Sequence, residues 1–514
     1  MIAAKRGGAC RYSGYRSILI HSVVMRGLDP RIHRLRKSMR KRMDPRVKPY
    51  DIHTCHGSCG GARKLTPYWD DSVCGGGYGA DAGPVWRRTA GKRGAFLYER
   101  LVAYGGKGVS VRQLGGSRAG EMRITRFLHN RKVTTAEMMS TAAARTCALV
   151  AGRHVLVIQD TSALRVDEKG LGLSFHPLLA VDANEGTVLG LVDNFFLTRK
   201  GGERAAYKKR SFEEKDSRRW LRGAERAAVL VEAGAACVSV VEDREGDIYE
   251  CFAFKPPHVE KLVRAAQDRR LADGSSLFAK ADAWNAAGQM VVELPAIPGR
   301  KARTAWLSVR FGKVEIMRPH NRKGSQRKVP KTLSVTLVIA CEINPPAGEE
   351  AAVGFLLTTP QVNDVADARR IIGFYRLRWT IEQLFRTMKT KGFAVEALRQ
   401  EQDGPLEKLV TAILITAVKV MQLVAEREGK ARRPITDILD PDDQPALERV
   451  NQDLEGKTEK QKNPHPMGSL AYAGWVFARL GGWTGYYGKP GPIVMLRGLT
   501  QFHAIKHGWS LRNV

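Results

Sequence analysis

The segment His154-Val-Leu-Val-Ile-Gln-Asp160 is a short apolar run that ends in a carboxylate. Its length and its β-branched residues predict a buried strand over 154–159. Three further strand candidates share this pattern: 175–181, 187–197 and 237–241. A helix is predicted over 216–233, before the last of these strands. Strands, then a helix, then another strand indicate an α/β core.

Two carboxylates occupy comparable places in this core. Asp160 directly follows the first predicted strand, and Asp243 follows Glu242 at the end of the fourth. Both would therefore project from strand ends of one sheet, where open α/β sheets bind their ligands. Asp is also a common strand terminator, so each position has a purely structural alternative.

A third carboxylate lies in the pattern Tyr375-x2-Arg378-x3-Glu382-x6-Lys389. A helix that begins at 364 and continues past 389 would bring these four side chains within roughly 60° of one another, and Arg386 joins the same face. That face carries a carboxylate, a phenol and several cations, which suits a charged ligand. The alternative is a solvated stripe held by ion pairs between Glu382 and the Arg residues one turn away.

Three carboxylates in a basic protein suit hard divalent cations, because Mg²⁺ and Mn²⁺ prefer oxygen ligands and leave room for a substrate phosphate. The candidate catalytic residues and metal ligands are therefore Asp160, Asp243 and Glu382, with two ions in one site. Such ions activate a water or a 3′-hydroxyl and stabilise the leaving oxygen in an in-line displacement at phosphorus. The cations and the phenol of the predicted helix would contact phosphate oxygens.

The charge balance indicates a polyanionic partner. Lys and Arg number 84 against 52 Asp and Glu, a net charge of +32, which is typical of proteins that bind nucleic acid. Residues 1–50 hold 14 basic and two acidic side chains, and either a nucleic-acid-binding arm or a translated upstream repeat explains them. Residues 300–331 carry 11 basic side chains and one Glu. The DNA-binding candidates of this stretch are Arg322, Lys323, Arg327 and Lys328.

Composition also bears on the compartment. The eight Cys are scattered along the chain, so reduced thiols are expected. Basic and polar residues at 11, 12 and 16 interrupt the stretch where a secretory signal needs an apolar run. The longest apolar run, 409–424, is interrupted by Lys419 and Gln422 and is too short to cross a bilayer. We expect an intracellular, cytoplasmic protein that does not associate with a membrane.

With these residues in place, the sequence resembles the DDE transposases of bacterial insertion sequences, specifically the insertion-sequence-four family with its Tyr-Arg-Glu-Lys signature. The resemblance covers about residue 95 to the C-terminus, and the order and spacing of its segments carry it. Those segments are Phe127-Leu-His-Asn, Gln159-Asp-Thr-Ser, Glu213-Glu-Lys-Asp-Ser-Arg-Arg-Trp220, Asp243-Arg-Glu-Gly-Asp247, Leu356-Leu-Thr-Thr, the signature at 375–389, Asn463-Pro-His-Pro-Met-Gly-Ser-Leu and Arg479-Leu-Gly-Gly-Trp483.

The resemblance implies an α/β fold with a ribonuclease-H-like catalytic core, a β-rich insertion between the second and third carboxylates, and flanking helical domains. The expected parts are a basic, Gly-rich and poorly ordered extension (1–90), a helical DNA-binding domain (91–150), the first part of the core (151–253), the insertion (254–359), the last part of the core with the signature helix (360–402) and a helical C-terminal domain for dimerisation and end binding (403–514).

The implied activity is Mg²⁺-dependent cleavage and strand transfer of double-stranded DNA, both transposon ends and target, by a homodimer that binds the terminal inverted repeats. Two alternatives stay open at the level of sequence. One is a catalytically decayed copy that only binds DNA and acts as an inhibitor. The other is a metal-dependent nuclease without strand transfer.

Overall fold

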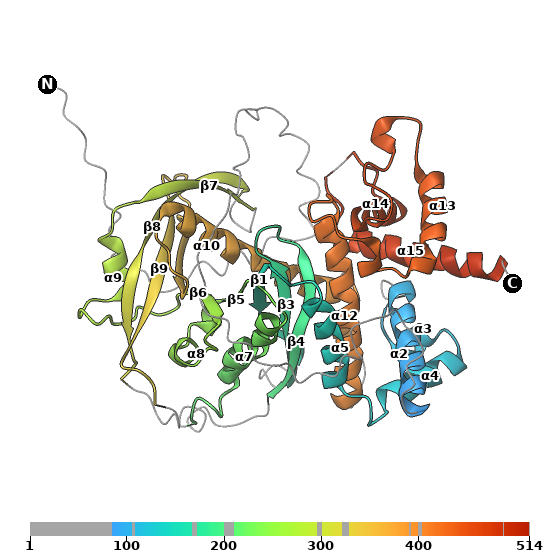
Figure 1. Ribbon diagram of the computed structural model, residues 1–514, viewed down its shortest axis with the longest axis horizontal. Coiled ribbons are helices and arrows are strands. Elements are labelled where there is room, and N and C mark those ends of the chain that lie inside the picture. The colour runs from blue at the N-terminus through green and yellow to red at the C-terminus, as the bar shows by residue number, and fades with distance from the viewer. Residues whose placement is uncertain are drawn as a thin grey trace.

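Strand β1 (His154–Gln159) lies inside a mixed sheet to which all ten described strands belong (Figure 1). The structure is a computed structural model that describes residues 85–104, 108–166, 172–199, 210–295, 301–320, 328–389, 392–398, 403–486 and 488–512. The other strands are β2 (Ser162–Val166), β3 (Gly172–Asp182), β4 (Val188–Arg199), β5 (Cys237–Glu242), β6 (Val259–Arg264), β7 (Gly288–Leu294), β8 (Arg303–Met317), β9 (Thr332–Glu342) and β10 (Val353–Thr358).

The strands are ordered β2-β3-β1-β5-β6-β10-β9-β8-β7, and β4 pairs with the outer side of β3. β1 is antiparallel to β3 and parallel to β5, and β5 is parallel to β6. The carboxyl ends of β1, β5 and β6 therefore meet at one edge of the sheet. From β6 onward the sheet continues through antiparallel pairs, so the β-rich stretch after residue 254 extends the same sheet.

The four strands expected from the apolar runs are confirmed as β1, β3, β4 and β5, the first with the predicted bounds. Burial explains them, because every residue from Val155 to Ile158 is fully buried and both faces of the sheet are covered in this region. β2 was not expected, since Ser162 and Arg165 interrupt its apolar pattern.

Helices cover the sheet and form a second body beside it. The longer ones are α2 (Val85–Tyr104), α4 (Arg118–Leu128), α5 (Thr135–Cys147), α7 (Arg219–Glu232), α10 (Val365–Leu377), α11 (Trp379–Met388), α12 (Asp403–Glu426), α13 (Gln444–Leu454), α14 (Leu470–Leu480) and α15 (Pro492–Arg512). Short ones are α3 (Val111–Gly115), α8 (Tyr249–Ala253), α9 (Leu277–Asp282) and the 3-10 turns η3 (Asp216–Arg218), η4 (Arg244–Gly246), η5 (Val395–Ala397), η6 (Ile435–Asp437), η7 (Pro441–Asp443) and η8 (Glu459–Gln461).

The two helical ends of the described chain pack together. α2 contacts α15, and the hydroxyl of Thr500 donates to the carbonyl of Val102 over 2.9 Å. α12 runs between them and the sheet, and the ammonium of Lys408 donates to the carbonyls of Leu128 and Asn130 at 2.9 and 2.8 Å (Figure 1). These carbonyls lie at the C-terminal end of α4, so a positive charge caps it.

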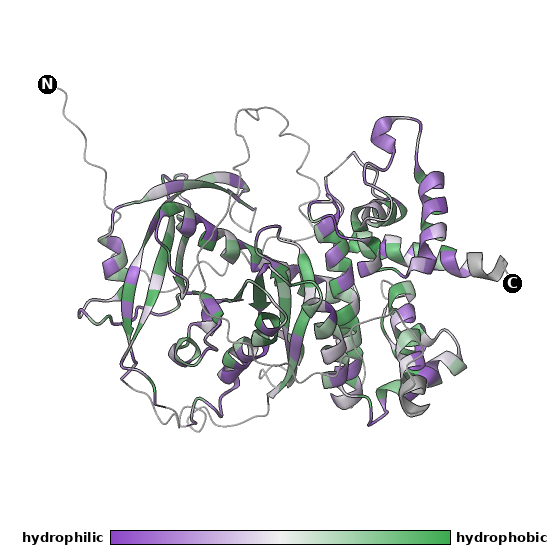
Figure 2. Cartoon of the chain, in the orientation of Figure 1, coloured by the Kyte–Doolittle hydropathy of each residue, from purple (hydrophilic) through white to green (hydrophobic). Residues whose placement is uncertain are grey.

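α12 carries mostly apolar residues along its length (Figure 2). Among the described helices it alone has the length and composition to cross a membrane, but 78% of its most apolar stretch is buried inside the protein. Its apolar character is therefore explained by packing against β4, α5, α11 and α14.

Candidate active site

The parallel pairing of β1 and β5 brings Asp160 and Asp243 to the same edge of the sheet. Ile158 pairs with Val241, so the residue after each strand end emerges beside its counterpart. The carboxylate of Asp160 accepts from the backbone N–H of Thr161 over 2.7 Å, and Asp243 caps η4 by accepting from Glu245 over 2.7 Å. Both acids keep an oxygen for other partners.

Arg378 joins the third carboxylate to the first. Its guanidinium lies 3.1 Å from Oδ2 of Asp160 and 3.4 Å from Oε1 of Glu382, and only 5% of Arg378 is exposed. Glu382 lies in the first turn of α11 and thereby reaches the strand edge. The structure therefore brings Asp160 and Glu382, which are far apart in the sequence, to one buried cation.

The pKa of the Asp160 carboxyl reflects how close the three acids lie to one another. Burial, together with the negative charges of Asp243 and Glu382, raises the pKa of the Asp160 carboxyl to about 7, although Arg378 acts in the opposite direction. Crowded carboxylates repel one another and each stabilises a cation placed among them. The oxygen donors present therefore fit a divalent cation, although among the residues described no three acidic, His or Cys side chains are gathered closely enough to hold one as they stand.

A second cation, the half-buried Arg264, borders the same edge and was not expected from the sequence. It follows Val263, which pairs with Glu242, so it lies at the end of β6 beside Asp243. Burial lowers the pKa of Arg264, whereas the nearby Tyr375 and Asp243 favour its charged form. Arg264 ends β6, which is parallel to β5 and, through it, to β1. Its position at the end of the third parallel strand is the signal that could have identified it as a site residue.

The prediction of one continuous helix from 364 past 389 is wrong. The helix is interrupted at Arg378, where the N–H of Arg378 bonds to the carbonyl of Tyr375 and the N–H of Ile381 bonds to that of Arg378. These three-residue spacings tighten the chain at that point. The segment 375–382 contains neither Pro nor Gly, and the ion pair between Arg378 and Asp160 supplies a tertiary reason for the break.

The break separates the expected polar face. Tyr375 stays with Arg378, and burial raises the pKa of its phenol, an effect that Arg378 and Arg264 oppose. Arg386 is half-buried in the last turn of α11. Lys389 lies just beyond the helix and forms a 3.1 Å ion pair with Glu396. Of the predicted face, the structure therefore unites Tyr375, Arg378 and Glu382 and directs Lys389 to another carboxylate.

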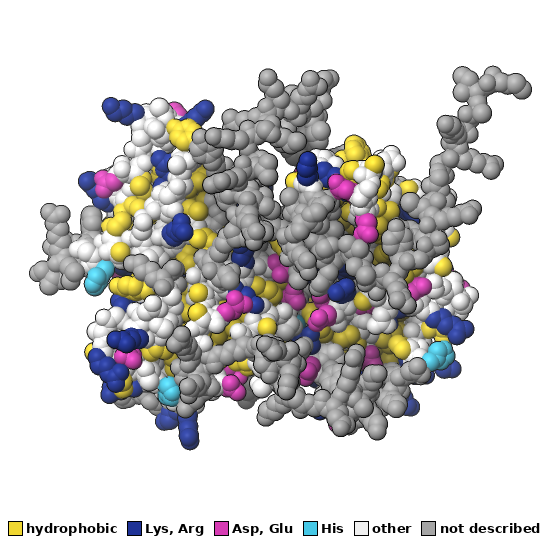
Figure 3. All heavy atoms as spheres, turned by 180° about the vertical axis from the view of Figure 1, so that it is seen from behind, with side chains coloured by type: hydrophobic (Ala, Val, Ile, Leu, Met, Phe, Trp, Pro, Cys, Tyr) yellow, Lys and Arg dark blue, Asp and Glu magenta, His cyan; other side chains and the backbone are white. Residues whose placement is uncertain are grey.

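The basic stretch 300–331 is only partly described. Lys328 is exposed, whereas Arg322, Lys323 and Arg327 lie outside the described residues, as does nearly all of the extension 1–90. Arg303 is neutralised by Glu342 at 2.9 Å. On the face that Figure 3 shows, Lys and Arg side chains are spread mainly toward the rim and Asp and Glu gather nearer the middle.

A buried polar network lies directly beneath the two strand-end acids. Gln159, which precedes Asp160, donates to Glu242, which precedes Asp243, over 2.7 Å, and Glu242 pairs with Lys261 on β6. Gln159 and Glu242 are 0% exposed and Lys261 is 1% exposed. The network ties β1, β5 and β6 together and so fixes the spacing of the two acids.

The network continues toward Arg219 at the start of α7. His176 bonds to Gln159 through Nε2 at 3.0 Å and to the hydroxyl of Thr161 through Nδ1 at 2.8 Å. Arg219 donates to that hydroxyl over 2.9 Å and to Glu245 over 2.9 Å. Thr161 and Glu245 therefore connect the turns that carry Asp160 and Asp243. A polar residue at the end of an apolar strand, such as Gln159, is the sequence signal for such a network.

Other acids near the strand ends are already committed to structural partners. Asp247 forms a buried pair with Arg269 at 2.5 Å, and Glu242 is neutralised by Lys261. Asp243 is thus the acid at the end of β5 that faces Asp160 without an ion-pair partner of its own among the described residues.

Comparison with known protein families places part of the chain in a described family. Residues 187–418 match the family described as transposase DDE domain. The matched segment runs from the start of β4 into α12 and contains Asp243, Arg378 and Glu382, whereas Asp160 precedes it. Together with the large mixed sheet and its covering helices, this match supports a DDE transposase.

Proposed function

We propose that the chain is the transposase of an insertion sequence of the Tyr-Arg-Glu-Lys type, which binds the terminal inverted repeats of its element and catalyses DNA cleavage and strand transfer. One observation carries the proposal. Acids from the end of β1, the end of β5 and the first turn of α11 lie around a single buried guanidinium at the strand edge.

In this proposal Asp160, Asp243 and Glu382 hold Mg²⁺ or Mn²⁺, in all two ions. When bound, these ions supply activation of the attacking water or 3′-hydroxyl and stabilisation of the leaving oxygen. The donor set is all carboxylate oxygen, which suits these metals better than the softer ones.

The other residues of the site bind and orient phosphates. Arg378 is already positioned among the acids and offers a fork of donors to a phosphate, and the phenol of Tyr375 lies beside it. Arg386, in the last turn of α11, and Lys389, just beyond that helix, add further cations for phosphate contacts. Contacts to the DNA backbone come from Lys328, Arg322, Lys323 and Arg327. Such contacts give affinity and salt dependence but no sequence specificity.

The flanking helices complete the proposed division of labour. Residues 91–150 and 403–514 bind the transposon ends and join two copies into a homodimer, whose setting is the bacterial cytoplasm at the nucleoid. The core and the β-rich extension of its sheet then act on DNA held between the two copies.

The test uses the full chain and a supercoiled plasmid that carries the element's inverted repeats, with Mg²⁺ or Mn²⁺. We expect nicking at the repeat ends and joining of the free 3′-hydroxyl to a target. Asp160→Asn, Asp243→Asn and Glu382→Gln should each abolish both products, whereas Asp442→Asn, at an exposed acid, should retain them.

Other outcomes identify the alternatives. Nicking without joining indicates a nuclease, and salt-sensitive binding to the repeats without cleavage in Mn²⁺ indicates a decayed copy that only binds DNA. Full activity in the three acid variants would refute the assignment of the site.

A further inference from the structure

A continuous chain of side-chain hydrogen bonds joins the residues on either side of the first strand-end acid to the residue before the second. Its members, in order, are Arg219, Thr161, His176, Gln159 and Glu242. Thr161 and Gln159 flank Asp160, and Glu242 precedes Asp243. The chain therefore holds the backbone that carries both acids.

The direction of the chain follows from the partners of Gln159. The amide nitrogen of this residue lies 2.7 Å from Glu242 and 3.2 Å from the backbone carbonyl of Trp220. A carbonyl oxygen can only accept, so the NH₂ group of Gln159 faces it, and the amide oxygen faces Nε2 of His176, 3.0 Å away. Nε2 of His176 therefore carries a proton.

His176 determines the direction of the remaining bonds. Burial holds the pKa of its ring well below the ordinary value, so the imidazole is neutral and has a single N–H. With that proton at Nε2, Nδ1 accepts, and the hydroxyl of Thr161 donates to it over 2.8 Å. The same hydroxyl accepts from Nε of Arg219 over 2.9 Å. Donation thus runs in one direction, from the Arg219 guanidinium to the Glu242 carboxylate, with a charge at each end.

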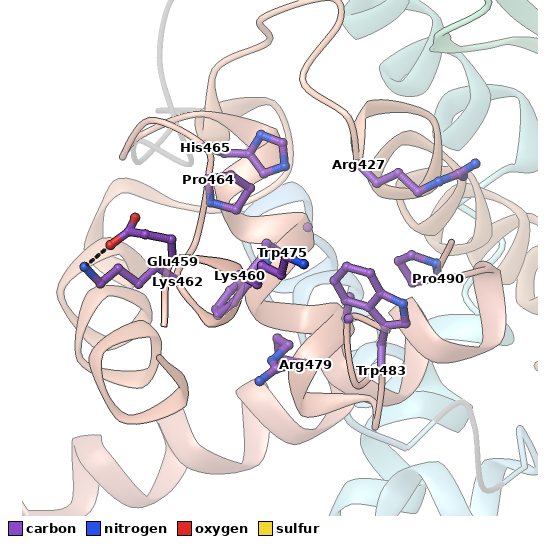
Figure 4. A pocket seen from close by; sticks show the side chains of 13 residues that line it. Arg427, Glu459, Lys460, Lys462, Pro464, His465, Trp475, Arg479, Trp483 and Pro490 are labelled. Carbon is purple, nitrogen blue, oxygen red and sulfur yellow. Dashed lines mark hydrogen bonds and ion pairs between the residues drawn. The ribbon is translucent and has the colours of Figure 1, made fainter. Parts of the chain in front are cut away.

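Burial makes this chain costly to break. Its three inner members are 0% exposed: His176, Gln159 and Glu242. A bond lost there leaves a buried polar group that water does not reach. The ion pair of Lys462 with Glu459 beside the C-terminal hollow, marked by a dashed line in Figure 4, is the opposite case, because its side chains are 48% and 87% exposed. Such exposed pairs contribute little to the position of the backbone.

Arg219 also reaches the turn after Asp243. Its Nη2 donates to Glu245 over 2.9 Å, and Glu245 lies in η4, which Asp243 caps. Its Nη1 donates to the carbonyl of Asp216 over 3.0 Å, which holds the guanidinium at the start of α7. One cation therefore connects the turn after β1 to the turn after β5.

We propose that Arg219 and Thr161 are positioning residues, which hold Asp160 and Asp243 at the separation that divalent cations require. This inference rests on the proposed function, because that separation matters for catalysis only if the two acids share metal ions. A direct DNA contact is a poorer account of Arg219, since its side chain is 7% exposed and each of its three guanidinium nitrogens already has a partner.

Two variants break the same link from its two sides. Thr161→Val removes the hydroxyl at nearly constant shape, and Arg219→Gln removes the guanidinium. Thr161→Ser keeps the hydroxyl and should behave as the parent does. The controls are Thr304→Val, at an exposed Thr on β8 whose hydroxyl donates to Glu293, and Arg226→Gln, which breaks another ion pair on α7.

The first measurement is the binding of Mn²⁺ to the full chain without DNA, followed by the paramagnetic resonance signal of the free ion. Thr161→Val and Arg219→Gln should each weaken binding by about tenfold or more, the effect typical of residues that orient metal ligands. The controls should bind Mn²⁺ as the parent does. The second measurement is the Mn²⁺ concentration for half-maximal plasmid nicking, which should rise by a similar factor while binding of the repeats in EDTA stays unchanged.

The direction of the chain has a test that needs no metal. Nitrogen-15 NMR of the full chain in EDTA, with His176→Gln to identify the signals, should show a protonated Nε2 and an unprotonated Nδ1. Thr161→Val should shift the Nδ1 resonance, because that nitrogen loses its donor, and should leave Nε2 protonated. A proton on Nδ1 in the parent would overturn the proposed chain.

The remaining outcomes separate this inference from the proposed function. Equal Mn²⁺ binding by the parent, Thr161→Val and Arg219→Gln overturns the inference alone, provided that Asp160→Asn loses metal. A loss in Thr161→Ser as large as in Thr161→Val also overturns it, since the hydroxyl is then not the cause. Weaker binding of the repeats by Arg219→Gln at unchanged Mn²⁺ affinity overturns it in favour of a DNA contact. If Asp160→Asn binds Mn²⁺ as the parent does, the proposed function fails and the inference fails with it.

Discussion

The guanidinium of Arg378 lies 3.1 Å from the carboxylate of Asp160, although 218 residues separate them in the chain. The same group contacts Glu382 at 3.4 Å, so one cation offsets part of the repulsion among the three acids. In the absence of metal, Arg378 is the positive charge at the centre of this site. Its removal should therefore lower the stability of the fold.

Arg378→Gln should therefore destabilise the protein by about 3 kcal/mol at pH 8 in EDTA, because breaking a buried ion pair leaves its partner uncompensated. Adding Mn²⁺ should raise the melting temperature of this variant more than that of the parent, since the metal replaces the lost charge. Thermal unfolding with and without Mn²⁺ measures both effects. Arg376→Gln, at an exposed position two residues earlier, is the control and should change neither.

Asp160→Asn should stabilise the metal-free protein above neutral pH. The pKa of this carboxyl is raised from 3.8 to about 7, so the folded protein holds the proton more firmly than the unfolded chain does. Stability contributed by that proton is present at low pH and is lost as the pH rises through about 7. At pH 8 the free energy of unfolding of the variant should exceed that of the parent by at least about 1 kcal/mol. At pH 4 the two values should be nearly equal.

Urea unfolding at both pH values in EDTA checks this prediction. The Asn side chain can keep the contact with the N–H of Thr161, so the comparison isolates the charge. If the difference in free energy of unfolding between Asp160→Asn and the parent were the same at pH 4 and at pH 8, this would contradict the close approach of the three acids.

Lys261→Met should cost about 3–5 kcal/mol, because the Glu242 carboxylate is left buried without its partner. The double variant Glu242→Gln with Lys261→Met should recover much of that loss, since a neutral amide can still accept the hydrogen bond from Gln159. Chemical unfolding of the single and double variants measures the coupling. Lys280→Met, which removes a half-exposed ion pair with Asp273, should leave stability unchanged.

Two helical glycines give opposite predictions for substitution by Ala. A Cβ at Gly223 would lie 1.9 Å from Oε1 of Gln159, so Gly223→Ala should displace the buried network and cost roughly 1–3 kcal/mol. A Cβ at Gly373 meets nothing within 4 Å, so Gly373→Ala should stabilise by about 0.5–1 kcal/mol. Thermal unfolding distinguishes them, and equal effects at the two positions would contradict the tight approach of α7 to Gln159.

Much of the sheet could be predicted from the sequence. The buried strands carry apolar runs, so β1 was predicted with its observed bounds and β5 to within one residue at its end, together with the acids that follow them. The helical spacing of Arg378 and Glu382 also predicted their ion pair, because residues four apart share a helix face. These features depend on local pattern alone.

The remainder depends on contacts between distant segments. The break at Arg378 follows no local signal, and its pairing with Asp160 is visible only once the sheet is assembled. Arg264 and Lys261 lie on β6, a strand whose polar residues hide its apolar pattern, so their approach to Asp243 and Glu242 could not be read from spacing. The roles of the three acids in catalysis stay a prediction.

The contact between α2 and α15 also constrains how this protein is made. Leu97 and Leu101 of α2 are buried, and the hydroxyl of Thr500 reaches a carbonyl 398 residues earlier in the chain. At about 5–20 residues per second, a ribosome needs on the order of 20–80 s to supply the covering helix after α2 has emerged. A nascent chain keeps the part of α2 that α15 covers exposed for the whole interval, and a product truncated before α15 keeps it exposed permanently.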